Sequence, residues 1–308
     1  MGWPRTAVAS GAASAVSDAS NNRHRGLRAG LAALALILMA PAGAVAADMP
    51  DFLRGSYSPS STRWDGFYFG GQAGWSSATV NYSNSLSPLT GYILRDSVLE
   101  SDVTGLQTMG RESPNHNNYG AFLGYNFQLA DQLVLGVEAN YTHLGLESSA
   151  ADTIERIFNN DTGAPSGHHY YYDTTVTGSA SVRIRDFATV RARAGYEMGQ
   201  FLPYAFGGLA IGRVDYFSSA TVGYTTQDKP DPATPPTTPD PPPSVSPVSK
   251  TDAQSNSIAY GFAAGLGVDV SILPNVFLRA EWEYVQFTPI HDIQVGVNSG
   301  RVGIGVKF

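Results

Sequence analysis

The C-terminal segment, residues 299–308, alternates apolar side chains with small or charged ones. Successive side chains of a β-strand point to opposite faces, so this segment would have one apolar face and one small or charged face. The apolar face comprises Val302, Ile304, Val306 and Phe308, and the other comprises Arg301, Gly303, Gly305 and Lys307. The pattern is typical of a strand that separates lipid from an interior, although a soluble strand can alternate in the same way.

Seven further segments show comparable alternation. They are residues 67–75, 119–128, 133–143, 176–196, 203–214, 258–270 and 276–287. In most of them one face collects aromatic and aliphatic side chains, as Phe67 and Trp75 do in the first. Segment 203–214 carries apolar residues on both faces, so its orientation stays open. In segment 176–196 the apolar residues occupy the even-numbered positions throughout, interrupted only by Asp186. Because this run is longer than a strand needs to cross a bilayer, we expect its first half to project outside as a hairpin arm.

The connections between these segments alternate in length. Only a few residues separate the second segment from the third, the fourth from the fifth and the sixth from the seventh, and the other connections are longer. Short periplasmic turns and long outer loops characterise outer-membrane barrels, and only helices and closed barrels satisfy every backbone polar group in lipid. A soluble barrel would share the strand count, but an eight-stranded interior could not take all the aromatic faces. We therefore expect an all-β fold, an eight-stranded antiparallel up-and-down transmembrane β-barrel over residues 64–308.

The N-terminal region has the features of a secretory signal peptide. An apolar run at residues 29–40 is followed by a proline and small residues. The cationic residues that precede this run are Arg23, Arg25 and Arg28. Export signals need this order of charge, apolar core and small residues, so cleavage is expected after Ala46, with Ala47 as the alternative. A membrane anchor is less favoured because the run is shorter than the ~20 residues that a spanning helix needs.

This organisation divides the chain into a signal peptide at residues 1–46, a flexible N-terminal arm at residues 47–63 and the barrel at residues 64–308. The leader is long, so translation could also start further downstream. Removing residues 1–46 takes away four arginines and one aspartate, which changes the formal net charge from −7 to −10. Nucleic-acid binding is not expected because it needs a concentrated basic surface.

The chain contains no cysteine, which excludes thiolate metal sites and thiol nucleophiles and suits an exported protein without disulfides. After the leader, no apolar run is long enough to span a membrane as a helix. Membrane insertion would therefore rely on strands.

Charged residues gather at positions expected to face the interior. This set is Glu138, Arg183, Arg185, Arg191, Arg193, Glu197, Arg279, Glu281, Glu283 and Arg301. Opposite charges in a narrow lumen should pair, since an isolated buried charge is costly. The lumen charge network that we expect comprises Glu138, Arg191, Arg193, Arg279, Glu281, Glu283 and Arg301. A plug is favoured over a proton or ion path because eight strands leave little continuous lumen, and nearby arginines argue against Glu281 and Glu283 as an acid–base pair.

The histidines do not favour an enzyme. None of the six is followed two residues later by a serine, the spacing that would place both on one strand face for hydrolase chemistry. His168, His169 and Tyr170 are weak candidates for binding haem or a metal, because imidazole and phenolate are iron ligands. An ordinary loop or interfacial aromatic role is favoured for them, and no cofactor is expected.

A proline-dense stretch, residues 230–247, lies in the connection before residue 258. Because proline lacks the N–H of a strand ladder, we expect an extended, polyproline-like outer loop within residues 215–256. Such a loop could display a ligand for a partner, although a surface spacer is the commoner role.

Three stretches carry a family resemblance: residues 64–74 (WDGFYFGGQAG), residues 189–208 and the ending at residues 302–308. They resemble the small outer-membrane porin and surface-antigen barrels of alphaproteobacteria, which are relatives of the OmpA-like transmembrane β-barrel. The resemblance covers residues 64–308 and implies location in the outer membrane. It also implies that Phe308 serves as an assembly signal for the barrel-assembly machinery, and haem binding by similar barrels keeps the receptor interpretation open. The first and third outer loops are longer than in the usual compact pattern.

From these observations we expect a non-enzymatic outer-membrane protein with a structural or surface role in the cell envelope and a charge-plugged lumen. The alternative is a narrow porin or a haem-binding surface receptor. Its expected partners are outer-membrane lipid and the barrel-assembly machinery.

Overall fold

The computed structural model describes residues 63–129, 132–233 and 238–308. These described residues belong to one compact unit. The predicted signal peptide at residues 1–46 and the predicted arm, apart from residue 63, lie outside the described residues.

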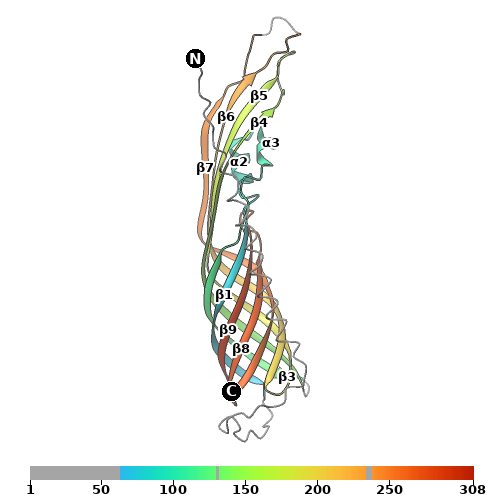
Figure 1. Cartoon of the computed structure of the whole chain (residues 1–308), viewed down its shortest axis with the longest axis vertical. Coiled ribbons are helices and arrows are strands. Elements are labelled where there is room, and N and C mark those ends of the chain that lie inside the picture. Colours follow the sequence, from blue (N-terminus) through green and yellow to red (C-terminus); the bar gives the residue numbers. More distant parts are fainter. Residues whose placement is uncertain (1–62, 130–131, 234–237) are drawn as a thin grey trace, which may run out of the picture. The chain divides into compact units, whose positions relative to one another are not determined.

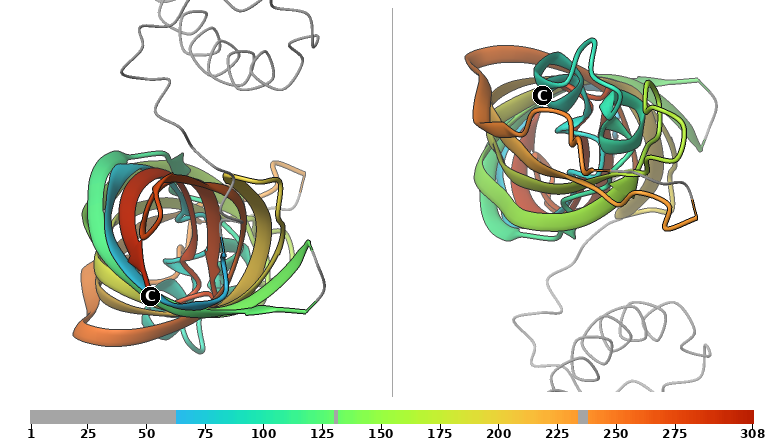
Figure 2. Two further views of the ribbon diagram at one scale, coloured as in Figure 1. Left: turned by 90° about the horizontal axis from the view of Figure 1, so that it is seen from below. Right: turned by 90° about the horizontal axis from the view of Figure 1, so that it is seen from above.

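Eight long antiparallel strands form a closed ring in the described residues (Figures 1 and 2). They are β1 (Gly66–Asn81), β3 (Asn115–Gln128), β4 (Leu133–Asn159), β5 (Tyr170–Tyr196), β6 (Phe201–Asp228), β7 (Val245–Leu273), β8 (Val276–Phe287) and β9 (Gln294–Lys307). Each pairs with the next in sequence, and β1 closes the ring by pairing with β9 from Tyr68 opposite Lys307 to Asn81 opposite Gln294. A ninth strand, β2 (Arg111–Glu112), pairs with the end of β1. The predicted eight-stranded up-and-down barrel is confirmed.

The period of two in the sequence sets the two faces of the barrel wall. The outward aromatic residues of β1 and β8, such as Phe67, Trp75 and Trp282, are exposed as they would be to lipid. In β6, the outward face carries Leu209 and Ile211, and the inward face carries aromatic residues of its own, described below. These inward aromatic residues explain why segment 203–214 has apolar side chains at both odd- and even-numbered positions.

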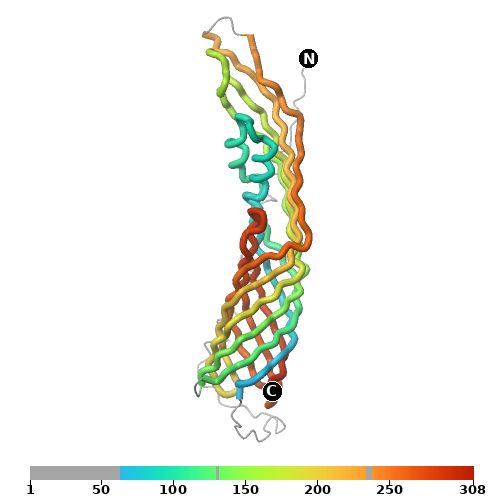
Figure 3. The backbone as a smooth tube through the Cα atoms, turned by 180° about the vertical axis from the view of Figure 1, so that it is seen from behind, coloured from blue at the N-terminus to red at the C-terminus, as the bar shows by residue number. Residues whose placement is uncertain are grey.

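Strands β4 to β7 continue past the end of the barrel as a four-stranded sheet, which we call the outer arm (Figures 1 and 3). It comprises residues 144–159 of β4, 170–185 of β5, 214–228 of β6 and 245–257 of β7. The predicted hairpin arm of segment 176–196 is therefore part of a larger sheet.

The first outer loop covers one face of the outer arm. It contains α2 (Ser87–Ile93) and α3 (Glu100–Thr104), neither of which is long and apolar enough to cross a membrane. Leu99 and Val103 of this loop pack with Tyr172 and Val222 in a buried cluster, so burial of apolar surface holds the loop on the sheet.

Register shifts interrupt the sheet where the barrel ends and the outer arm begins. They lie between His143 and Leu146 on β4 and between Ile184 and Asp186 on β5. Such a bulge places two consecutive residues on one side of the strand. The even-numbered apolar residues of β5 consequently face lipid in the barrel and the protein core in the outer arm.

The bulge corrects two expected lumen positions. Arg183 and Arg185 are exposed on the outer arm and lie outside the barrel interior. Odd-numbered residues of β5 face the lumen only after the bulge, whereas Arg183 precedes it and Arg185 lies within it. Arg185 donates a hydrogen bond to Asp215 of β6 at 2.7 Å. Glu197 lies in the turn after β5, where it accepts a hydrogen bond from Gln128 at 3.2 Å.

The proline-rich segment also differs from expectation. Its last proline, Pro247, lies inside β7, which begins at Val245 and pairs with β6. At this level β7 is an edge strand with a register shift beside it, and proline is tolerated at such positions because no ladder bond is lost. The loop proper is confined to residues 229–244.

Candidate functional site in the barrel lumen

The lumen holds a cluster of charged side chains from five of the eight barrel strands. The members are Glu138 of β4, Arg191 and Arg193 of β5, Asp269 of β7, Arg279, Glu281 and Glu283 of β8, and Arg301 of β9. Several pairs sit directly opposite each other on adjacent strands, among them Glu138 with Arg191 and Glu281 with Arg301. Opposite charges at such cross-strand positions attract, so the strand register itself assembles the cluster.

Arg191 is the centre of the cluster. Its Nε donates to Glu138 Oε1 at 3.0 Å, its Nη1 to Glu281 Oε1 at 2.9 Å and to Glu283 Oε1 at 3.0 Å, and its Nη2 to Glu281 Oε2 at 2.6 Å. The planar guanidinium group presents its donors in a fixed fork, so one arginine can hold several carboxylates at once. The guanidinium also lies 3.9 Å from the ring centroid of Phe206, one of the inward aromatic residues of β6.

Arg193 and Arg279 share Asp269. Arg193 Nη2 donates to Asp269 Oδ2 at 2.8 Å, and Arg279 donates through Nε to Oδ1 at 2.9 Å and through Nη2 to Oδ2 at 3.1 Å. Arg279 also reaches Glu138 Oε2 at 2.9 Å. The hydroxyl of Tyr68 donates to the same Glu138 oxygen at 2.7 Å.

Arg301 completes the cluster from β9. Its Nη2 lies 2.7 Å from Glu281 Oε1 and 2.6 Å from Glu283 Oε2, and its Nη1 donates to Thr142 at 2.9 Å. Tyr204 donates its hydroxyl hydrogen to Glu281 Oε2 at 2.9 Å. Both Glu281 and Glu283 are thus held by arginines, the arrangement that argued against an acid–base pair.

Asp269 is the member that sequence reasoning missed. With it, the cluster contains four guanidinium groups and four carboxylates, whereas the seven expected residues carry four positive charges and three negative ones. Each of the eight side chains is at most 2% exposed. Because burial of an uncompensated charge is costly, the surplus positive charge pointed to a further inward carboxylate.

Mainly uncharged layers lie above and below the charged one, with Lys307 Nζ 4.2 Å from the ring centroid of Trp64 on the side of the short turns. Toward the short turns, an apolar cluster includes Trp64, Phe122 and Phe277. On the other side, Gln72 donates to Asn140 at 3.1 Å, and a larger apolar cluster then continues into the outer arm. The lumen therefore contains apolar, charged, polar and again apolar layers along its length.

The weak haem or metal candidates lie at the tip of the outer arm. His168 Nδ1 lies 2.5 Å from Asp228 Oδ2, and His169 Nδ1 lies 2.9 Å from Asp161 Oδ2. The carboxylate of Asp161 raises the pKa of His169 and, through the same hydrogen bond, the pKa of Asp161 is lowered. Tyr170 is buried at the first position of β5, and the described residues contain no group of three or more acidic or histidine side chains that could hold a metal.

Phe308, the expected assembly signal, lies at the end of the barrel that carries the short turns. Its ring stacks on Phe69 with centroids 5.8 Å apart, and its backbone N–H donates to the carbonyl of Phe67 at 2.9 Å. The side chain is 70% exposed. The terminal aromatic residue is thus held at the lipid-facing wall, and its role as a signal stays a prediction.

Several known proteins are similar to this chain. The chain is 26% identical to a 22 kDa outer membrane protein of Rhizobium leguminosarum bv. viciae over 216 residues, which covers 66% of this chain and 74% of that protein. It is 25% identical over 201 residues to a 25 kDa outer-membrane immunogenic protein of Brucella ovis, covering 65% of this chain and 68% of that protein. Among solved structures, Neisserial surface protein A aligns with 79% of this chain and 97% of its own at 15% identity and a TM-score of 0.32.

The family match extends over most of the sequence. Residues 29–308 match the outer membrane protein beta-barrel domain, and both curated relatives are outer-membrane proteins, so the resemblance to small outer-membrane barrels is confirmed. This chain is a β-barrel protein of the outer membrane and belongs to the outer membrane protein beta-barrel domain family.

Proposed function

We propose that this protein is a non-enzymatic structural and surface protein of the cell envelope, in which a barrel with a closed lumen anchors the outer arm. The observation that carries the proposal is the neutral cluster of eight buried charged side chains across the lumen. It supports an anchoring role over a transport role.

The physical reason is the energetics of the lumen. Arg191 alone connects three carboxylates, so an ion or water file would have to displace several charge-assisted hydrogen bonds at once. An ion that had passed the charges would then meet the apolar side chains of Trp64, Phe122 and Phe277, which cannot solvate it.

The outer arm supports the surface role. The sixteen residues of β5 at positions 170–185 would extend about 50 Å at the usual rise per strand residue. The packed first outer loop gives this sheet a core of its own through Leu99 and Val103. The arm is thus built to hold its tip at a distance from the barrel.

The histidines support the non-enzymatic part of the proposal. His168 and His169 hydrogen-bond to aspartates, and His291 Nε2 lies 2.9 Å from the hydroxyl of Tyr216. These partners suit structural links in the outer arm, and the family's members named above are described as outer-membrane proteins without a reaction.

Planar bilayers test the closed lumen. Purified, refolded protein should insert without stable unitary current steps, with a known porin as the positive control for insertion. The double variant Arg301→Ala with Glu283→Ala removes one positive and one negative group from the cluster and should raise the leak current if the charges contribute to closure. Reproducible openings of the unmodified barrel would overturn the proposal in favour of the narrow porin.

A further inference from the structure

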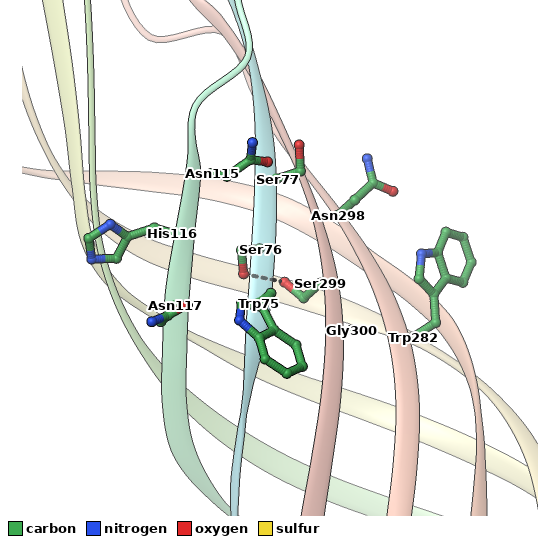
Figure 4. A pocket seen from close by; sticks show the side chains of 10 residues that line it. All are labelled: Trp75, Ser76, Ser77, Asn115, His116, Asn117, Trp282, Asn298, Ser299 and Gly300. Carbon is green, nitrogen blue, oxygen red and sulfur yellow. Dashed lines mark hydrogen bonds between the residues drawn. The ribbon is translucent and has the colours of Figure 1, made fainter. Parts of the chain in front are cut away.

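A hollow of about 450 Å³ lies on the outer wall of the barrel, where β1, β3, β8 and β9 run side by side. Trp75 of β1 and Trp282 of β8 both sit directly opposite Gly300 of β9, one from each side. The two indoles are 72% and 47% exposed, and a Cβ placed on Gly300 would meet no atom within 4 Å. The three residues form a groove with aromatic walls and a glycine floor, as Figure 4 shows.

A row of neutral polar side chains lies one step further along the same face. Ser77 is opposite both Asn298 of β9 and Asn115 of β3, and all three are exposed (Figure 4). No lysine, arginine, aspartate or glutamate is among the described residues that line the hollow. The polar row can donate and accept hydrogen bonds, and it lacks the cations that a phosphate group would need.

The position of the groove along the strand fits one membrane leaflet. Phe67 and Phe69 mark the end of β1 nearest the short turns, and Trp75 is the last outward aromatic residue before Ser77. The eight steps from Phe67 to Trp75 span about 26 Å along the strand and about 20 Å along the membrane normal at the usual strand tilt, so Trp75 lies near the outer boundary of the ~25 Å apolar band. The groove therefore lies at the boundary between the hydrocarbon and the headgroups of the outer leaflet.

We propose that this groove binds one outer-leaflet glycolipid with an uncharged, hydroxyl-bearing headgroup. An acyl chain lies over Gly300 between Trp75 and Trp282, and the sugar hydroxyls hydrogen-bond to Asn298, Ser77 and Asn115. The wall already faces lipid, so hydrocarbon is the occupant that the site meets in the membrane. The acyl chain of the lipid fills the space that a side chain at position 300 would take, and it gains contacts with the indoles of Trp75 and Trp282. The neutral polar row selects the headgroup.

Gly300 offers a variant that fills the groove without disturbing the barrel. The backbone at Gly300 and the open space above it accept a larger side chain, so Gly300→Leu should fold normally. Gly71→Leu is the matched control, because Gly71 also faces outward and its nearest atom to a Cβ is 3.8 Å away. A change of electrophoretic mobility on boiling verifies that both variants are folded.

Tryptophan fluorescence can measure occupancy of the groove. The protein without its leader is refolded into vesicles of brominated phosphatidylcholine mixed with digalactosyl diacylglycerol, phosphatidylglycerol or unbrominated phosphatidylcholine. Bromine quenches Trp75 and Trp282, whereas Trp64 is buried in the lumen and supplies a constant background. Digalactosyl diacylglycerol should protect the fluorescence of Trp75 and Trp282 from bromine quenching severalfold more than its mole fraction in the vesicles predicts.

The variants separate a built site from ordinary contact with bulk lipid. Gly300→Leu should abolish the extra protection and Gly71→Leu should retain it. The proposal would be overturned if quenching of the unmodified protein followed the mole fraction of brominated lipid in every mixture. It would also be overturned if Gly300→Leu kept the extra protection by the galactolipid. Equal protection by phosphatidylglycerol would overturn the assignment of an uncharged sugar headgroup.

Discussion

Glu138 and Arg279 project from strands on opposite sides of the ring and meet in the lumen, where Arg279 Nη1 donates to Glu138 Oε2 at 2.9 Å. The strand order places β4 and β8 half a turn apart around the barrel. A direct contact between them means that the side chains fill the cross-section at this level. The same contact makes the charge network a brace between opposite walls.

Removal of the Glu138 charge should destabilise the barrel. Glu138→Gln leaves Arg191, Arg193 and Arg279 with one carboxylate fewer, and such a loss from a buried pair costs about 3–5 kcal/mol. Urea titration of the reversibly folded barrel in vesicles measures the change in unfolding free energy.

The control for this variant is Glu147→Gln, which removes an exposed carboxylate from the outer arm. It should change the unfolding free energy by no more than about 0.5 kcal/mol. Equal losses in the two variants would contradict the bracing role of Glu138.

Asp269 and Arg279 should be energetically coupled. Asp269→Asn and Arg279→Gln should each destabilise the barrel, and the double variant should lose less than the sum, with a coupling of about 0.5–3 kcal/mol. A double-mutant cycle from urea titrations measures it. Additive effects would show that the two hydrogen bonds between these groups contribute little.

Deletion of the terminal aromatic ring tests the assembly signal. If Phe308 is read by the assembly machinery, Phe308→Ala should lower the amount of folded protein in the outer membrane of cells and leave refolding in detergent unchanged, because that machinery is absent from detergent. Phe67→Ala is the control, since it removes an aromatic neighbour of Phe308 and keeps the terminal ring. A similar loss in cells for both variants would assign the effect to packing at the barrel wall.

The tip of the outer arm should be most ordered in mildly acidic solution. The raised pKa of His169 means that its contribution is complete below its ordinary value of 6.5 and is lost as pH rises through the raised value. The lowered pKa of Asp161 means that its contribution is complete above 3.8 and is lost as pH falls through the lowered value.

Hydrogen exchange at the backbone amide of Tyr170, which donates to Asp161 at 2.8 Å, reports this dependence. Protection should be greatest between pH ~4 and ~6.5 and weaker on either side, with a small amplitude because both side chains are exposed to solvent. Asp161→Asn should flatten the profile. A profile unchanged by that variant would contradict the role of the pair.

Haem titration tests the receptor interpretation. If the two histidines serve as links to Asp228 and Asp161, the unmodified protein and the double variant His168→Ala with His169→Ala should bind haem equally weakly. Absorbance in the Soret region measures binding. Much tighter binding by the unmodified protein would favour a haem-binding surface receptor.

The alternation of side chains was sufficient to predict the barrel, because each strand separates lipid on one face from the lumen on the other. The period of two also places all eight lumen charges on the inward face, and seven of them were predicted to form the network. Alternation alone did not locate the bulge at Arg185, because an extra residue leaves the even-numbered apolar series of β5 in place on both sides of it. The interruption at Asp186 was its visible sign.

Two further differences have local physical causes. Asp269 has the parity of the inward residues of segment 258–270, but alternation within a single strand does not show which charges must balance across the lumen. Pro247 enters a strand because β7 is an edge at that level, and whether a strand is an edge depends on its neighbours in the fold.

The bulge in β5 also restricts how this protein can change over evolutionary time. A one-residue deletion at this bulge would reverse which side chains of β5 face the core of the outer arm. Val182 and Ile184 would then point into solvent and Arg183 toward the core. Loops at the tip can gain or lose any number of residues. Length changes in β5 near the barrel rim should therefore be tolerated only in steps of two, because an even change keeps the same residues on the core side of the outer arm.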